Sequence, residues 1–285
     1  MRFSLAALAL ANAVTVLAAP QVDPGRFSCG APEPSAEHVA ISQAFAKDEA
    51  MAIANGTVTK RAVTTIDVYF HVVASSTAAS GGYLSDALLN AQLDALNAAY
   101  APHQYQFVLK GIDRTVNAAW AVDGNGNELT MKKALRKGTY RSLNVYYLKD
   151  MGSNLGYCYF PTTATAGSTT YIRDGCTVLY STVPGGTLAN YNKGHTTTHE
   201  VGHWLGLYHT FQGGCTGSGD SVSDTPAQAS ASSGCPVGRD SCPSQAGVDP
   251  IHNYMDYSYD TCYEEFTPGQ KARMDSYWAA YRAGK

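Results

Sequence analysis

The sequence predicts an α+β fold, in which one mixed β-sheet and several helices share a core. This class is favoured because strand-like and helix-like patterns are mixed along the chain, and a second observation, the distribution of the large aromatic residues, places the domain. All 19 tyrosines and all three tryptophans lie beyond residue 61, so the packed domain should begin near that point. An α/β fold whose sheet includes an antiparallel strand is the alternative.

Seven segments have the pattern of a strand or a helix. In the first strand, residues 65–74, apolar side chains alternate with other residues, and further strands are predicted at residues 104–112, 143–148 and 177–183. A helix at residues 86–100 has Ser85 as its N-cap and leucines on one face. A short helix is predicted near residues 129–137, and a closing amphipathic helix at residues 268–282 has Thr267 as its N-cap.

The first residues, MRFSLAALALANAVTVLAAP, have the features of an export signal. Arg2 precedes an apolar run, and Val16 and Ala18 stand where signal peptidase accepts small or aliphatic side chains. A membrane anchor is the alternative, but the run is short for a bilayer span and no stop-transfer charges follow it. We therefore expect residues 1–18 to be a cleaved signal peptide and the product to be secreted, extracellular and not bound to a membrane.

A second boundary is predicted at Lys60-Arg61, where a dibasic pair coincides with the change in aromatic content. We interpret residues 19–61 as a removable prosegment and residues 62–285 as the domain, a length suited to one large domain or two closely packed subdomains. Two solvated surface charges are the alternative, since Lys132-Lys133 is a dibasic pair without such a change. The glycosylation sequon at Asn55 lies in the prosegment, so we expect a glycan on the precursor and none on the processed domain.

Charge and cysteine content restrict the partners and the compartment. The net charge of −3 is spread over interspersed acids and bases, with no basic tract for nucleic acid and no basic amphipathic helix for a membrane. Seven cysteines in an exported protein indicate disulfides, but an odd number cannot pair completely within one chain. Cys29 stands apart in the prosegment, and the other six lie between Cys158 and Cys262. Nothing in the sequence demands more than a monomer.

The segment THEVGHWLGLYHTF, residues 198–211, has the spacing of a metal site. On a helix, His199 and His203 project from one face and can bind one ion, with Glu200 beside it. Gly206 tolerates positive φ and lets the chain leave the helix, so that His209 can return as a third ligand.

Three neutral histidines leave one coordination position for water, which is typical of catalytic zinc. Zinc lowers the pKa of that water to about 7, and Glu200 can accept its proton as it attacks a carbonyl carbon and then pass it to a leaving amine. This chemistry hydrolyses amide bonds, as a zinc endopeptidase does. Two alternatives stay open: a secreted binding protein with structural zinc, and an amidase that acts on non-peptide substrates.

The full motif H-E-x-x-H-x-x-G-x-x-H, with Met255 in the run Asn253-Tyr-Met-Asp-Tyr257, resembles the metzincin clan. Within that clan, most of residues 62–285 resembles the pappalysin-type family, which includes secreted fungal and archaeal endopeptidases. Further matching segments are Asn154-Leu-Gly-Tyr, Phe160-Pro161, Asp174-Gly175 and residues 219–226. The resemblance implies one zinc ion, protein or peptide substrates, and a sheet with the zinc helix across a cleft from an irregular, disulfide-held C-terminal subdomain.

The resemblance also implies roles for single residues. Met255 would form an apolar floor beneath the metal, and the Tyr257 hydroxyl would stabilise the oxyanion of the transition state; core packing is the alternative for each. Arg26-Phe-Ser-Cys29-Gly30 is similar to a family element, with one extra residue after the arginine. Its Cys29 thiolate would occupy the open zinc position in a latent zymogen, whereas an unpaired cysteine in a disposable segment is the alternative.

The resemblance further implies disulfides, a calcium site and a strand that binds substrate. The implied pairs are Cys215–Cys242, Cys235–Cys262 and Cys158–Cys176, the first two of which would hold the Gly- and Ser-rich loop at residues 213–247. Asp220, Asp224 and Thr225 would offer oxygen ligands to calcium, although solvated loop charges are the alternative. The strand near residues 177–180 would bind an extended substrate through main-chain hydrogen bonds.

Overall fold

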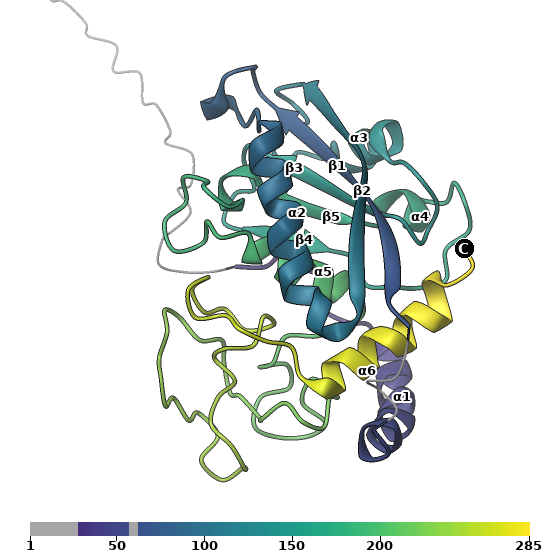
Figure 1. Cartoon of the computed structure of the whole chain (residues 1–285), viewed down its shortest axis with the longest axis vertical. Coiled ribbons are helices and arrows are strands. Elements are labelled where there is room, and N and C mark those ends of the chain that lie inside the picture. The colour runs from purple at the N-terminus through teal and green to yellow at the C-terminus, as the bar shows by residue number, and fades with distance from the viewer. Residues whose placement is uncertain (1–27, 57–61) are drawn as a thin grey trace, which may run out of the picture.

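The computed structural model describes residues 28–56 and 62–285, and its centre is a mixed sheet with the strand order β2-β1-β3-β5-β4 (Figure 1). β1 pairs in parallel with β2 and β3, and β3 pairs in parallel with β5, whereas β4 at the edge is antiparallel to β5. The prediction of an α+β fold with a mixed sheet is therefore confirmed. The strands are β1 (Thr64–Ala74), β2 (Tyr105–Val116), β3 (Leu143–Leu148), β4 (Gly156–Cys158) and β5 (Cys176–Leu179).

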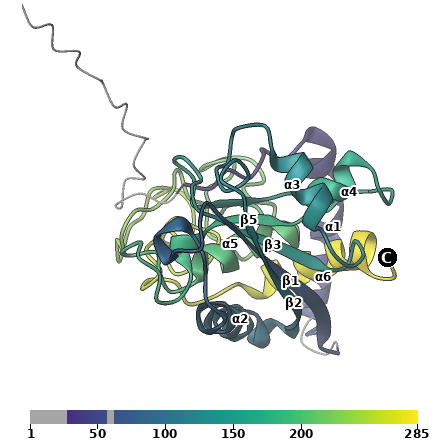
Figure 2. The same cartoon turned by 90° about the horizontal axis from the view of Figure 1, so that it is seen from above.

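Helices cover both faces of this sheet (Figure 2). On one face, Val68, Phe70 and Val72 of β1 share a core with residues of α2 (Asp86–Tyr100) and α5 (His195–Trp204). On the other face, Val73 and Tyr146 pack with Met131 of α3 (Glu128–Leu135), which is followed by α4 (Thr169–Arg173). Successive strand residues point to opposite faces, so both faces of the sheet are buried.

Most predicted elements agree with the structure to within a few residues. The helix at residues 86–100 is α2 with the same bounds, and the Ser85 side chain accepts a hydrogen bond from the Leu88 N–H. The closing helix is α6 (Pro268–Tyr277), capped by Thr267 and continued by a π-helical turn at Trp278–Arg282. β5 is shorter than predicted, because a 3-10 turn at Tyr180–Thr182 follows it.

The prediction that the strand near residues 177–180 forms the substrate-binding edge is wrong. β5 lies between β3 and β4, and both of its sides are paired over its length. The edge next to β5 is β4, a strand of three residues that was not predicted because so short a run has no readable alternation. Main-chain pairing at the sheet edge is therefore available on β4.

The proposed prosegment contains a helix that was not predicted, α1 (Ala36–Ala54). This helix lies beside α6 of the domain (Figure 1). Ser35 caps its N-terminus by accepting a hydrogen bond from the His38 N–H. Its buried residues are His38, Ser42 and Glu49. Because these side chains are polar, the helix shows no apolar stripe in the sequence. The predicted signal peptide, Arg26 and the Lys60-Arg61 pair lie outside the described residues.

The chain between α5 and α6 contains no helix or strand and forms the irregular lower part of Figure 1. The structure contains the disulfides Cys215–Cys242 and Cys235–Cys262 in this part, and Cys158–Cys176 between β4 and β5. These are the three pairs that the family resemblance implies. Cys29 is the one free cysteine of the described residues. None of the helices in the described parts of the chain is long and apolar enough to cross a membrane.

Candidate metal centre

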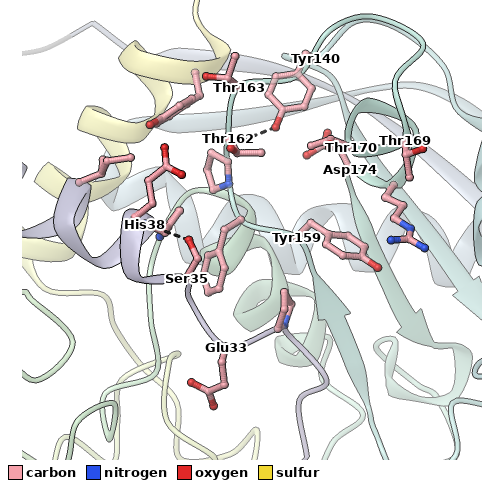
Figure 3. Close-up of a pocket in the computed structure, with 17 residues that line it drawn as sticks. Glu33, Ser35, His38, Tyr140, Tyr159, Thr162, Thr163, Thr169, Thr170 and Asp174 are labelled. Atoms are coloured by element: carbon pink, nitrogen blue, oxygen red, sulfur yellow. Dashed lines mark hydrogen bonds between the residues drawn. The ribbon is translucent and has the colours of Figure 1, made fainter.

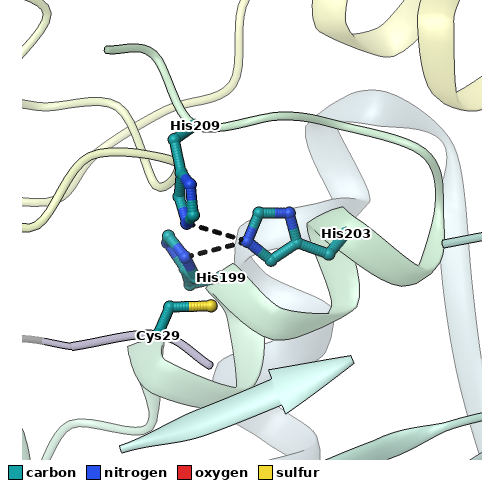
Figure 4. Close-up of side chains that lie close together, drawn as sticks. All are labelled: Cys29, His199, His203 and His209. Atoms are coloured by element: carbon teal, nitrogen blue, oxygen red, sulfur yellow. Dashed lines mark hydrogen bonds between the residues drawn. The ribbon is translucent and has the colours of Figure 1, made fainter. Parts of the chain in front are cut away.

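The histidines of the motif lie on α5 and on the turn that follows it. His199 and His203 are one turn apart on α5, so their imidazoles project from the same face of the helix. Gly206 has φ of +97°, and a Cβ at this position would lie 2.2 Å from the ring of Tyr277. Only glycine fits this turn, which returns His209 toward the helix (Figure 4).

Backbone carbonyls orient two of the imidazoles. Nδ1 of His199 lies 2.7 Å from the Tyr254 carbonyl oxygen, and Nδ1 of His203 lies 2.7 Å from the Leu207 carbonyl oxygen. Each Nδ1 therefore donates to a carbonyl and leaves the lone pair of Nε2 available to a metal. Burial lowers the pKa of all three histidines, that of His203 to about 4, so the rings stay neutral as ligands must be.

The spacing of the ligand atoms fits a zinc ion. Nε2 of His203 lies 3.2 Å from Nε2 of His199 and 3.1 Å from Nε2 of His209. A tetrahedral ion with Zn–N distances of about 2.0–2.1 Å places its nitrogen ligands about 3.3–3.4 Å apart. With Cys29, these residues form the only group of three or more His, Cys, Asp or Glu in the described residues whose ligand atoms lie within 4.8 Å of one another.

Cys29 reaches this centre because the segment around it pairs with the edge strand. Cys29 forms a parallel bridge with Gly156 of β4. The Gly30 N–H donates to the Gly156 carbonyl and the Leu155 N–H donates to the Ser28 carbonyl, both at 2.8 Å. Three residues of the N-terminal segment therefore extend the sheet beyond β4 and lie over the metal centre.

The Cys29 thiol lies beside Glu200. Its Sγ atom is 3.4 Å from Oε2 of Glu200. It also accepts a hydrogen bond from the Ala31 N–H, with a distance of 3.3 Å between sulfur and nitrogen. Burial and the neighbouring carboxylate raise the pKa of this thiol, so a cation among the histidines is needed to favour the thiolate. Burial also raises the pKa of Glu200 to about 8, and a divalent ion would act in the opposite direction.

Tyr257 and Met255 lie on a turn that contacts α5 and His209. The Tyr257 hydroxyl accepts a hydrogen bond from the Cys29 N–H at 3.2 Å and lies 3.2 Å from Nε2 of His209. Met255 is fully buried, and a Cβ at Gly202 would lie 2.4 Å from its Sδ atom. The phenol is therefore at the centre itself, while the methionine packs against the helix that supplies two histidines.

The two carboxylates predicted to bind calcium, Asp220 and Asp224, each accept hydrogen bonds from protein groups, and they share none of these donors. The Asp220 carboxylate accepts hydrogen bonds from Thr225 Oγ1 at 2.8 Å and from the Val222 N–H at 3.0 Å, and burial raises its pKa to about 7. Asp224 accepts from Thr267 Oγ1 at 2.7 Å and from the Gly269 N–H at 2.8 Å. Asp224 thus stabilises the N-terminus of α6, and calcium at this loop stays a prediction.

A cavity of about 370 Å³ lies between the N-terminal segment and the domain (Figure 3). Ser35 and His38 line it from the segment, and Phe160 lines it from the domain. The Phe160 ring contacts the His203 ring edge-on, with centroids 5.4 Å apart. Phe160-Pro161 matched the family pattern, but no local pattern in the sequence indicated that this ring contacts a ligand. The N-terminal segment therefore covers one side of the metal centre.

This arrangement is typical of a metal-dependent peptidase. Three imidazoles converge as metal ligands would, a carboxylate and a phenol lie beside them, and a sheet edge nearby can pair with a peptide. A family model described as pregnancy-associated plasma protein-A, a peptidase family, matches residues 132–279. Together with the curated relatives, this match shows that the chain belongs to that family, the pappalysin-type metallopeptidases.

Curated relatives and solved structures agree with this assignment. The chain is 67% identical to an extracellular metalloprotease of Podospora anserina, over 99% of each chain, and 56% identical to extracellular metalloprotease 1 of Coccidioides posadasii, over 100% of each. Mature mirolysin of Tannerella forsythia with a cleaved peptide matches with a TM-score of 0.65 and 29% identity, over 75% of this chain and 91% of that one. A promirolysin mutant matches with a TM-score of 0.68 and 27% identity, over 88% and 93%.

The protein is therefore an extracellular metalloendopeptidase that acts on proteins or peptides. The prediction of secretion is confirmed, because the relatives are named extracellular metalloproteases in several fungi. The resemblance to the pappalysin-type family is confirmed as well. The alternatives of a non-catalytic binding protein and of a non-peptide amidase do not fit a member of this family.

Proposed function

We propose that this protein is made as a latent zymogen and that its processed form hydrolyses peptide bonds with one zinc ion held by His199, His203 and His209. The observation that carries the proposal is the convergence of the three imidazoles with the Cys29 thiol, which itself contacts Glu200. A zinc ion in this centre would act as a Lewis acid, polarising a carbonyl oxygen and lowering the pKa of a water.

Glu200 acts as the general base in this proposal. Its Oε2 atom is 3.4 Å from the Cys29 Sγ atom, so a water in place of the thiol would lie within reach of the carboxylate. Glu200 accepts a proton as the water oxygen attacks the peptide carbonyl carbon. It then delivers that proton to the amide nitrogen as the C–N bond breaks.

Tyr257 stabilises the charge that develops on the carbonyl oxygen. Its hydroxyl now accepts from the Cys29 N–H, and removal of the segment takes this donor away. The hydroxyl, 3.2 Å from the His209 ligand atom, is then placed to donate to an oxyanion beside the metal. Met255 supports the centre by packing against α5.

β4 aligns the substrate through its main chain. The N-terminal segment already uses the Leu155 N–H and the Gly156 carbonyl as partners at this edge. An extended peptide can form the same hydrogen bonds once the segment has left, and such pairing is largely indifferent to side chains. The edge therefore binds protein substrates and directs their main chain over the metal centre.

Latency follows from the position of Cys29. Its thiolate would be the fourth ligand and would exclude the attacking water. In this proposal residues 1–18 are removed as a signal peptide, residues 19–61 are the prosegment, and cleavage at Lys60-Arg61 gives the 62–285 domain. The processed domain is a monomer, binds zinc, carries no N-linked glycan, and can bind calcium at Asp220, Asp224 and Thr225.

The test is hydrolysis of gelatin by residues 62–285, beside Glu200→Ala and Glu264→Ala variants. The Glu264 side chain is 70% exposed, so its variant controls for loss of a carboxylate away from the centre. We expect activity in the wild type and the control, none in Glu200→Ala, and loss on chelation that zinc reverses. Full activity of Glu200→Ala, or of the chelated and metal-depleted protein, would refute the mechanism.

A further inference from the structure

α1 is anchored to the domain by a buried ion pair. Glu49 of α1 accepts three hydrogen bonds from Arg273 of α6: Nε donates to Oε1 at 2.9 Å and to Oε2 at 3.1 Å, and Nη2 donates to Oε2 at 2.8 Å. The two side chains are only 7% and 1% exposed, and Arg273 also donates to the Ser221 carbonyl at 2.6 Å. Within the described parts of the chain, Glu49 is the only acidic side chain that forms an ion pair with Arg273.

A second group of contacts joins α1 to the same face of α6. Ser42 Oγ lies 2.7 Å from the Tyr277 hydroxyl and 2.9 Å from the Tyr208 hydroxyl. The His38 ring stacks on the Tyr277 ring with centroids 4.8 Å apart, and its Nδ1 lies 2.6 Å from the Tyr208 hydroxyl. Tyr208 precedes the ligand His209, so this contact surface extends from α6 to the turn that carries the metal ligand.

We propose that the α6 face formed by Arg273 and Tyr277, with Tyr208, is a second binding surface for residues 28–56 that does not depend on the metal. The segment then stays bound after the chain is cut at Lys60-Arg61 and inhibits its own enzyme in trans. Full activation requires a further cut between Cys29 and Glu49. The inference rests on the proposed function, since it concerns how that metal centre is kept latent.

The segment contacts the domain at two anchors, Cys29 and Glu49, and each anchor keeps the other close to its own binding site. Cys29 lies at the metal centre and Glu49 lies 20 residues further along the segment, on the far side of the Tyr208 contacts. Two linked anchors keep each other at high effective concentration, so loss of one contact does not release the other. A cut at Lys60-Arg61 leaves the chain between Cys29 and Glu49 intact, so the two anchors stay joined to each other. Release therefore requires that the anchors be separated from each other.

The test is a titration of synthetic peptides 28–56 into residues 62–285 carrying Glu200→Ala, which prevents cleavage of the peptide. Heat of binding is measured with zinc and with chelator for three peptides: the native one, Glu49→Gln and Asp48→Asn. Asp48 is the exposed neighbour of Glu49 on α1, so its variant removes the same charge without touching α6. The changes are confined to the peptide and cannot unfold the domain.

We expect Glu49→Gln to bind at least about 100-fold more weakly, because it leaves Arg273 buried without its carboxylate. Asp48→Asn should bind within about twofold of the native peptide, and the difference should persist in chelator, which weakens only the Cys29 anchor. Equal affinities of the Glu49→Gln and Asp48→Asn peptides, or no binding of the native peptide in chelator, would overturn the proposal.

A second measurement follows the segment after cleavage. Precursor carrying Glu200→Ala and cut only at Lys60-Arg61 should retain residues 28–56 through gel filtration, and an added cut between Cys29 and Glu49 should release them. Elution of the free segment after the first cut alone would also overturn the proposal. If wild-type residues 62–285 hydrolyse no gelatin while peptide binding still depends on Glu49, the proposed function is refuted, and only the metal-independent binding surface on α6 and Tyr208 stands.

Discussion

Replacement of Asp174 by asparagine tests a buried charge cluster that holds the C-terminal end of α5, the helix with the two motif histidines His199 and His203. Its carboxylate accepts from Arg282 Nη2 at 2.9 Å, from Arg136 Nη2 at 3.3 Å and from Trp204 Nε1 at 3.1 Å. Trp204 follows His203 of the motif, and the Arg282 and Arg136 side chains are 0% and 5% exposed. Asparagine has nearly the same shape but no charge, so it leaves two buried cations without their partner. Breaking such a pair costs about 3–5 kcal/mol.

The assay is unfolding of residues 62–285 by urea and by heat, with tryptophan fluorescence as the readout. Both variants are made in a Glu200→Ala background, which removes self-digestion. For a domain of this length, a loss of about 3–5 kcal/mol lowers Tm by about 6–20 °C. The matched control is Asp67→Asn, because Asp67 and Lys110 form a 3.6 Å pair with side chains 46% and 45% exposed. The control should lose less than about 0.5 kcal/mol. A loss below about 1 kcal/mol in Asp174→Asn would refute the reasoning.

Three further predictions concern catalysis, the disulfides and pH. Tyr257→Phe should lower kcat on gelatin about 10- to 100-fold with little change in KM or zinc content, and an unchanged kcat would remove the phenol from the mechanism. Reduction should cost about 3–4 kcal/mol for each disulfide with a sequence separation of 27, measured in urea, and should reduce gelatin turnover; undiminished turnover would contradict it. Burial lowers the pKa of His38 to about 4, and the Tyr208 and Tyr277 hydroxyls and the Arg273 cation face its ring. In the free peptide His38 protonates near pH 6.5, so the affinity of peptide 28–56 should fall as pH falls from about 6.5 toward 4. The affinity of the His38→Gln peptide should fall less over this range. Equal dependence of the two affinities on pH would show that His38 is not the group responsible.

The convergence of the three motif histidines could be predicted because their geometry is local. His199 and His203 are set by the helix period, and Gly206 is set by the one turn that returns His209. The same reason explains the agreement for α2 and α6, whose caps Ser85 and Thr267 act within three residues. Where a structural feature depends on neighbours close in the chain, a single sequence contains most of the information.

The sheet edge could not be predicted in this way. β4 has three residues, and its place is fixed by its partner β5 and by the Cys158–Cys176 disulfide. The prediction therefore assigned the edge to the strand near residues 177–180, which is internal. Asp174 shows the same limit, since its partners Arg136 and Arg282 are far from it in the sequence. Long-range pairing decides both features, and no local pattern reports it.

α1 was not predicted, for a reason that bears on its proposed removal with the prosegment. A helix that must leave a folded domain exposes the surface it covered, and a large apolar face would then favour aggregation. The Phe45 ring of α1 does contact the Tyr277 ring, with centroids 5.3 Å apart. The buried side chains of α1, however, are His38, Ser42 and Glu49, which contact the Tyr208 and Tyr277 hydroxyls and the Arg273 guanidinium. Water can replace these partners once the helix has gone. The buried polar side chains that made α1 hard to predict therefore suit the role proposed for it. They bind the domain while the Cys29 and Glu49 anchors are joined, and they leave no large apolar surface on the enzyme after the anchors are separated.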